Sequence, residues 1–99
     1  LRHGLHLFVV ILTPGVFKAD RDNIVTALRG ENIGAAVHYT SLTKEPFYAA
    51  LDPDASKTTP IANAVSEVIF SLPLRPDFTS KDEGDVLEAV HKVLKYYRR

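Results

Sequence analysis

The sequence contains no cysteine, which excludes disulfides and metal sites built on thiolates. This absence fits the reducing conditions of the cytoplasm, where we expect the protein to act. Charge of one sign is not in excess either, because 12 basic residues balance 12 acidic ones. Proteins that bind nucleic acid usually have a basic excess or a basic stripe, so nucleic acid is not an expected partner.

Long apolar runs are also absent, and no association with a membrane is expected. The longest run, Leu7 to Leu12, is too short to cross a bilayer and lacks the flanks of a secretory signal peptide. Methionine is missing too, and the chain begins with Leu1. Translation begins at methionine, and a bulky second residue usually prevents its removal. We therefore expect the chain to be a fragment, or a trimmed form, of a longer protein.

The apolar pattern of the first half predicts two strands around one helix. His6 to Leu12 is rich in Val, Ile and Phe and closes at a Pro-Gly turn, which is typical of a buried strand. A helix capped by Asp20 or Asp22 follows and stops at Gly30. The next stretch, Ile33 to Tyr39, is apolar on both faces and predicts a second strand.

The second half predicts two longer helices and one short strand. Thr59 and Pro60 mark the start of a helix whose pattern ends near Ile69. Phe70 to Leu74 then alternates and predicts a short third strand, which should be an edge strand or an extended segment because prolines flank its end. Ser80 to Glu83 matches a capping box that opens the terminal helix.

This order of elements predicts one α+β domain over residues 1–99, in which a small sheet of about three strands is covered by helices on one face. The hydrophobic fraction of 45% and the charged fraction of 24% are ordinary for such a domain. The core is expected to contain Phe8, Val10, Ile24, Leu28, Val37, Val65, Ile69, Leu72, Val86, Val90 and Val93.

Four motifs occur in a fixed order along the chain. They are the opening His6-Leu7-Phe8, the Arg-Asp-led stretch from Arg21 to Leu28, the stretch from Asn32 to Tyr39, and Ser71 to Pro76, which reads Ser-Leu-Pro-Leu-Arg-Pro. Together they resemble the C-terminal part of the DegT/DnrJ/StrS family. These enzymes use pyridoxal phosphate to transaminate keto-sugars attached to nucleotides. The resemblance implies the small domain of a fold-type-I enzyme, which packs on a large catalytic domain that is missing here.

The sequence departs from the family pattern at two places. The family usually continues His-Tyr with x-Pro-Leu-His, whereas this chain has Ser41 in place of the proline and Thr43 in place of the second histidine. A glutamate common in the helix before Ser-Leu-Pro-Leu appears here as Asn63. We therefore expect altered sugar or phosphate contacts in this loop.

His38 and Tyr39 are the candidate substrate-binding residues. They end a predicted buried strand, and strand ends on a rigid scaffold commonly carry ligand contacts. Both side chains can hydrogen-bond sugar hydroxyls or phosphate oxygens. The alternative interpretation is a half-buried aromatic pair that closes the sheet edge. The resemblance implies that both residues approach the nucleotide-sugar, in the active site of a neighbouring subunit of a homodimer.

None of the lysines has the sequence context of a catalytic residue. A transaminase holds its cofactor through a lysine. Of the six lysines, only Lys57 superficially resembles one, and its polar loop predicts a solvated side chain. His3 and His6 face opposite sides of a predicted strand, so no metal site is expected. The resemblance implies that the cofactor lysine belongs to the large domain. We expect no catalytic residue, no bound pyridoxal phosphate and no transaminase activity in this chain alone.

Two functions are compatible with the sequence. The first is the C-terminal domain of a pyridoxal-phosphate-dependent aminotransferase in cell-surface polysaccharide or antibiotic-sugar biosynthesis. The second is a free-standing α+β module that binds or responds to a small ligand without catalysis. The first predicts an apolar patch left uncovered by the missing partner, whereas a true monomer rarely exposes one above a few hundred Å².

Overall fold

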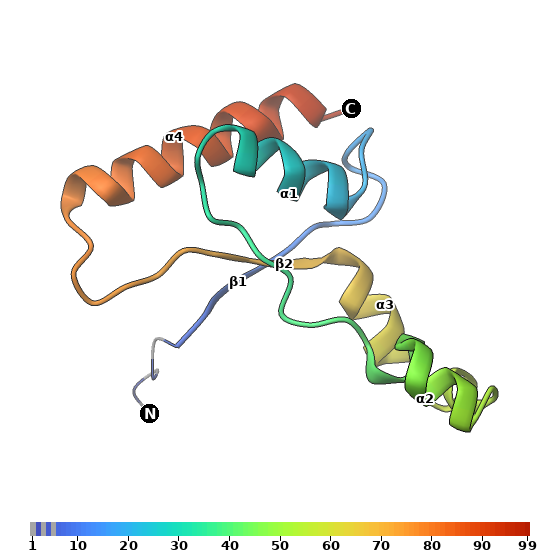
Figure 1. Ribbon diagram of the computed structural model, residues 1–99. Coiled ribbons are helices and arrows are strands. Elements are labelled where there is room, and N and C mark those ends of the chain that lie inside the picture. The colour runs from blue at the N-terminus through green and yellow to red at the C-terminus, as the bar shows by residue number, and fades with distance from the viewer. Residues whose placement is uncertain (1, 3, 5) are drawn as a thin grey trace.

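Two short antiparallel strands lie at the centre of the structure. Figure 1 shows the computed structural model, which describes residues 2, 4 and 6–99. β1 (Phe8–Ile11) pairs with β2 (Ile69–Leu72), with Phe8 opposite Leu72. Because the two strands are about 60 residues apart in the sequence, the sheet joins the two halves of the chain.

β2 has a hydrogen-bonded neighbour on each side: β1 on one side and the single residue Ala36 on the other. Ser71 exchanges two backbone hydrogen bonds with Ala36: its N–H donates at 2.7 Å and its carbonyl oxygen accepts at 3.0 Å. β2 is nevertheless one of the two edge strands of a two-stranded sheet, as predicted, with this single bridge on its other side. Pro73 follows the strand instead of interrupting it, so the strand keeps the N–H groups that pairing requires.

The predicted strand from Ile33 to Tyr39 is also wrong, because it is reduced to the single bridge at Ala36. Just before that bridge, the Ile33 N–H donates to the Leu28 carbonyl and the Ala35 N–H donates to the Ile33 carbonyl. A backbone that turns back on itself cannot present consecutive residues to a neighbouring strand. Among the described residues the sheet thus has two strands rather than about three.

Two helices, α1 (Arg21–Gly30) and α4 (Ser80–Tyr97), pack on each other and on the same side of the strands (Figure 1). As predicted, Asp20 caps α1, and its carboxylate accepts from the Asn23 N–H at 2.8 Å. The capping box of α4 begins one residue earlier than predicted. Thr79, which has an extended backbone, is the cap, and it bonds reciprocally with Asp82.

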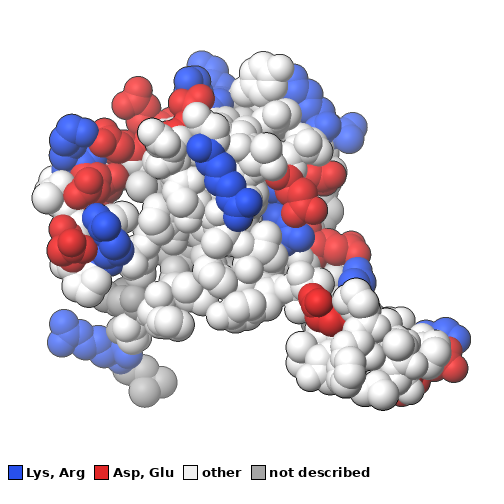
Figure 2. All heavy atoms as spheres, in the orientation of Figure 1, with Lys and Arg blue, Asp and Glu red and all other residues white. Residues whose placement is uncertain are grey.

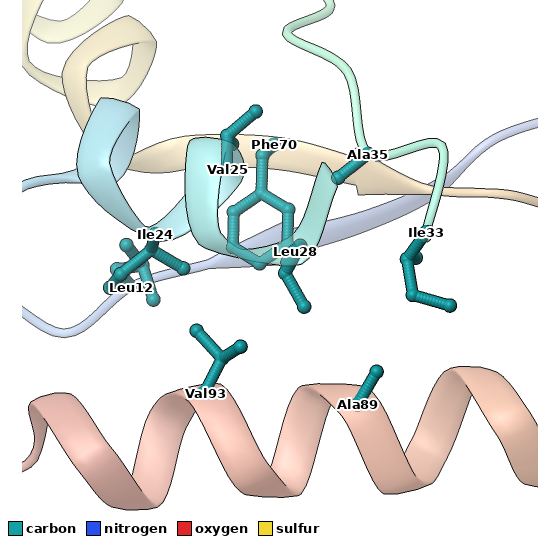
Figure 3. Packing of buried hydrophobic residues seen from close by; sticks show 9 residues of the cluster. All are labelled: Leu12, Ile24, Val25, Leu28, Ile33, Ala35, Phe70, Ala89 and Val93. Atoms are coloured by element: carbon teal, nitrogen blue, oxygen red, sulfur yellow. The ribbon is translucent and has the colours of Figure 1, made fainter. Parts of the chain in front are cut away.

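The core lies between these helices and the strands, and we call β1, β2, α1 and α4 together the body. Figure 3 shows that Val93 and Ala89 of α4 face Ile24 and Leu28 of α1, with Phe70 of β2 beside them. The buried apolar set is Leu12, Ile24, Val25, Leu28, Ile33, Ala35, Phe70, Ala89 and Val93.

The predicted core is confirmed in its centre and wrong at two positions. Ile24, Leu28 and Val93 are buried, but Phe8 is 57% exposed and Val65 is 40% exposed. Neither side chain is covered by another part of the described chain, although each fits the apolar period of its own element. The other predicted core residues are half-buried: Val10, Val37, Ile69, Leu72, Val86 and Val90.

Residues 40–65 form an arm that projects from the body (Figures 1 and 2). It contains α2 (Pro46–Leu51), most of α3 (Pro60–Val68) and two 3-10 turns, η1 (Leu42–Lys44) and η2 (Ala55–Thr58). The predicted helix start at Thr59 and Pro60 is confirmed. Every residue of the arm is described, and only Ser41 among them is buried. The arm therefore has no apolar core of its own.

Candidate functional site

His38 and Tyr39 lie where the chain leaves the body and enters the arm. The bridge between Ala36 and Ser71 ties the backbone to β2 two residues before His38. Their rings meet edge to face, with centroids 5.1 Å apart and an interplanar angle of 69°. The sheet therefore fixes the start of this segment, while the two side chains follow at its junction with the arm.

Tyr39 of this pair is open to a partner from outside the described chain, whereas the Nδ1 atom of His38 is buried. Tyr39 is 71% exposed, so it does not fit the alternative of a half-buried pair that closes the sheet edge. His38 is half-buried, and its Nδ1 atom is buried without a hydrogen-bond partner among the described residues. An imidazole nitrogen kept from both water and a partner is costly, so this atom is suited to receive one.

A network of hydroxyl and amide groups begins two residues after this pair in the chain. The Thr43 hydroxyl donates to Asn63 Oδ1 at 3.1 Å and lies 2.9 Å from the Thr59 hydroxyl and 3.2 Å from the Ser41 hydroxyl. Asn63 Nδ2 donates to the Ser56 carbonyl at 2.8 Å. The network joins η1 to η2 and α3, and so connects the segment after Tyr39 to the rest of the arm.

This network was missed by the reasoning from sequence. Its members are polar residues of ordinary type, spaced 16 and 20 residues from Thr43. A signal was nevertheless present, because Thr43 and Asn63 are the positions at which the sequence departs from the family pattern. Thr59 was predicted to cap α3; it is the cap residue, but its hydroxyl contacts Thr43 and makes no capping hydrogen bond.

Two charged contacts fasten the base of the arm. Arg21 of α1 donates from Nη1 to the carbonyl oxygens of Ser66 and Ile69, at 2.9 and 2.8 Å. These bonds satisfy carbonyl groups at the C-terminus of α3, where no further helical turn follows. Lys44 of the arm pairs with Glu67 in the last turn of α3, and the hydrogen bond from Lys44 lowers the pKa of the Glu67 carboxyl.

The lysines occupy exposed positions. Lys57 pairs with Asp54 on η2 at 2.5 Å, as expected of a solvated lysine, and Lys81 pairs with Asp85 at 2.6 Å. A Schiff-base lysine needs an enclosed site that can depress its pKa and hold a cofactor. The described lysines do not provide this environment.

The described residues give little support for a metal site or for a membrane-spanning helix. They include no group of three or more histidine or acidic side chains placed to hold a metal ion. His6 is described, while His3 lies outside the described residues. No helix in the described part of the chain combines the length and apolar character needed to span a bilayer.

The comparisons with known proteins agree with one another. A model of the DegT/DnrJ/EryC1/StrS aminotransferase family matches residues 1–91. The uncharacterized protein MJ1066 of Methanocaldococcus jannaschii is 32% identical over 98 residues, which cover 99% of this chain and 25% of that protein. The spore coat polysaccharide biosynthesis protein SpsC of Bacillus subtilis is 33% identical over 95 residues, covering 95% of this chain and 24% of SpsC.

The fold also has a counterpart among solved structures. Spr1654 of Streptococcus pneumoniae, assigned as a sugar aminotransferase and solved in its PMP form, superposes with a TM-score of 0.80 at 24% identity. The match covers 92% of this chain and 22% of that one, and it shows the shared α+β fold. The chain spans about a quarter of the length of the curated relatives that it matches.

Proposed function

The chain belongs to the DegT/DnrJ/EryC1/StrS aminotransferase family, and from this we propose that it is the C-terminal domain of an aminotransferase that acts on nucleotide-linked keto-sugars. The observation that carries the proposal is the family match over residues 1–91, in a chain that spans only a quarter of its relatives. The name of SpsC places one relative in polysaccharide biosynthesis, which favours a role of that kind here.

Pyridoxal phosphate is the proposed cofactor of the intact enzyme, and the rest of the enzyme would hold it. When bound, it supplies the electron sink that amino-group transfer requires. The described residues of this chain do not fit a cofactor cradle, because their lysines are exposed. The proposed contribution of this domain is therefore to bind and orient the sugar substrate.

His38 and Tyr39 are the proposed binding residues. The exposed Tyr39 hydroxyl can hydrogen-bond a sugar hydroxyl or a phosphate oxygen, and the Nδ1 atom of His38, which is buried without a partner among the described residues, can do so once the side chain turns outward. The bridge from Ala36 to β2 supplies the rigid support that a binding residue needs.

The exposed apolar side chains support the proposal that a packing partner of this chain is missing. Most of the large apolar side chains that are exposed lie on β1 or on the arm, including Phe8, Ile11, Phe47, Leu51 and Ile61. Exposed apolar side chains gathered on particular elements are typical of surfaces that pack against another domain or subunit. We propose that the large catalytic domain and a second subunit of a homodimer cover them.

The test is kinetic and uses the full-length enzyme. His38→Ala and Tyr39→Phe should each raise the KM for the nucleotide-sugar by roughly 2- to 12-fold, the equivalent of one neutral hydrogen bond. The absorbance of bound cofactor should not change. His91→Ala and Tyr96→Phe, which alter exposed residues of the same types on α4, are matched controls. The proposal fails if the enzyme transaminates no such sugar, or if His38→Ala and Tyr39→Phe both keep the wild-type KM.

A further inference from the structure

The Thr43 hydroxyl has no hydrogen-bonding capacity left for a substrate. A hydroxyl can donate one hydrogen bond and accept two. Because Asn63 Oδ1 can only accept, Thr43 donates to it, and so Thr43 accepts from the hydroxyls of Ser41 and Thr59. The role of Thr43 is therefore internal to the arm, rather than the altered substrate contact that the sequence suggested.

Asn63 is oriented just as firmly. Its Nδ2 donates to the Ser56 carbonyl, which can only accept, so the amide oxygen must be the atom that faces Thr43. Asn63 lies on the first turns of α3, whose C-terminus is held to the body by Arg21. A continuous set of contacts thus runs from α1 through α3 to the segment that follows Tyr39.

The two departures from the family pattern meet at one hydrogen bond. A histidine at position 43 and a glutamate at position 63 would pair an imidazole donor with a carboxylate acceptor. The threonine and asparagine of this chain keep the same direction, from donor at 43 to acceptor at 63, without charge. A glutamate at position 63 alone would be a half-buried carboxylate without a cation. A histidine at position 43 alone would put an imidazole where the hydroxyl now makes all three of its hydrogen bonds.

We propose that Thr43 and Asn63 are a coupled pair of positioning residues that hold the segment carrying His38 and Tyr39 against α3. The consequence for substrate rests on the proposed function, whereas the pairing itself rests only on the contacts of the arm.

The first experiment removes the hydroxyl in the full-length enzyme. Thr43→Val leaves three polar groups without their partner and should raise the KM for the nucleotide-sugar roughly 5- to 50-fold, with kcat little changed. Thr43→Ser keeps the hydroxyl and should stay within about twofold of wild type. Thr58→Val, which alters an exposed threonine of the same arm, is the matched control and should have no effect.

The second experiment exchanges the pair. Thr43→His and Asn63→Glu should each raise the KM, and the double variant should recover most of the loss, because residues in direct contact are not additive. Additive effects in this cycle, or a wild-type KM in Thr43→Val, would overturn the proposal in an enzyme whose wild type is active.

Amide hydrogen exchange of the full-length protein supplies a readout that does not depend on activity. Residues 38–44 should exchange faster in Thr43→Val than in Thr43→Ser or Thr58→Val, with exchange in α1 and α4 unchanged. Unchanged exchange in residues 38–44 would overturn the pairing. If the wild type transaminates no nucleotide-sugar while exchange responds as expected, the proposed function fails and the pairing stands.

Discussion

The body and the arm are held together by different forces. In the body, nine apolar side chains are buried between α1, α4 and the strands. In the arm the buried residue is a serine, and the contacts that join its elements are hydrogen bonds between hydroxyl, amide and carbonyl groups. Figure 2 shows the arm as a separate lobe beside the body.

This difference indicates which region is stable by itself. Burial of apolar area is the main favourable term in folding, and the body has it. The arm has instead a fixed polar framework and apolar side chains that face outward. Its framework sets its shape, and a partner surface is needed to remove those side chains from water.

The largest expected effect is a loss of stability that a substitution causes in the body but not in the arm. Leu28 is 0% exposed and Leu51 is 69% exposed, so the same substitution tests both. Leu28→Ala should lower the free energy of unfolding of the chain by about 2–5 kcal/mol, and Leu51→Ala by less than about 0.5 kcal/mol. Denaturant unfolding of both variants measures this. Equal losses would show that the arm is part of the same core.

The next effect concerns the contact between the regions. Arg21→Met keeps the side-chain stem but removes both hydrogen bonds to the end of α3, and should lower the free energy of unfolding by about 1.5–3 kcal/mol. Amide exchange should accelerate at the end of α3 more than in the middle of α4. Arg75→Met, at an exposed arginine, is the control. Uniform acceleration across the chain would contradict a local role for Arg21.

The smallest expected effects are changes in stability when the pH is lowered. Hydrogen bonds from Thr79 lower the pKa of Asp82 in the body, and the hydrogen bond from Lys44 of the arm lowers the pKa of Glu67 at the end of α3. A lowered folded pKa means that the stabilisation is complete above the ordinary values of 3.8 and 4.5 and is lost as pH falls below them.

Asp82→Asn and Glu67→Gln should therefore lose more stability relative to wild type at pH 7 than at about pH 3. The difference for Glu67→Gln should also shrink in high salt, because its carboxylate is solvent-exposed and screened. Unfolding free energies measured across this pH range provide the test. A difference that grows on acidification would refute the assigned direction.

Local features of the sequence predicted local structure well. The cap at Asp20, the start of α3 at Thr59 and Pro60, and the helical character of α4 follow from residues within one turn of each other. The capping box of α4 was displaced by one residue, because Thr79 and Ser80 are chemically alike and only the backbone distinguishes the cap from the first helical residue.

Predictions failed where distant segments meet. Ile33 to Tyr39 has the composition of a buried strand, but hydrogen bonds back to Leu28 leave only Ala36 for the sheet. The candidate pair His38 and Tyr39 was found through the resemblance, and its role in binding stays a prediction. The partners of Thr43 could not be found at all from spacing, because no short-range pattern relates it to Thr59 or Asn63.

The sequence by itself determined the helices, their caps and the family of this chain, because those depend on neighbouring residues and on motifs in order. The tertiary structure alone decided that Ala36 bridges to β2, that Phe8 is left exposed, and that Thr43 meets Asn63. Those outcomes depend on the path of the chain between distant segments, and contacts across 20 or 60 residues have no periodic signature in the sequence.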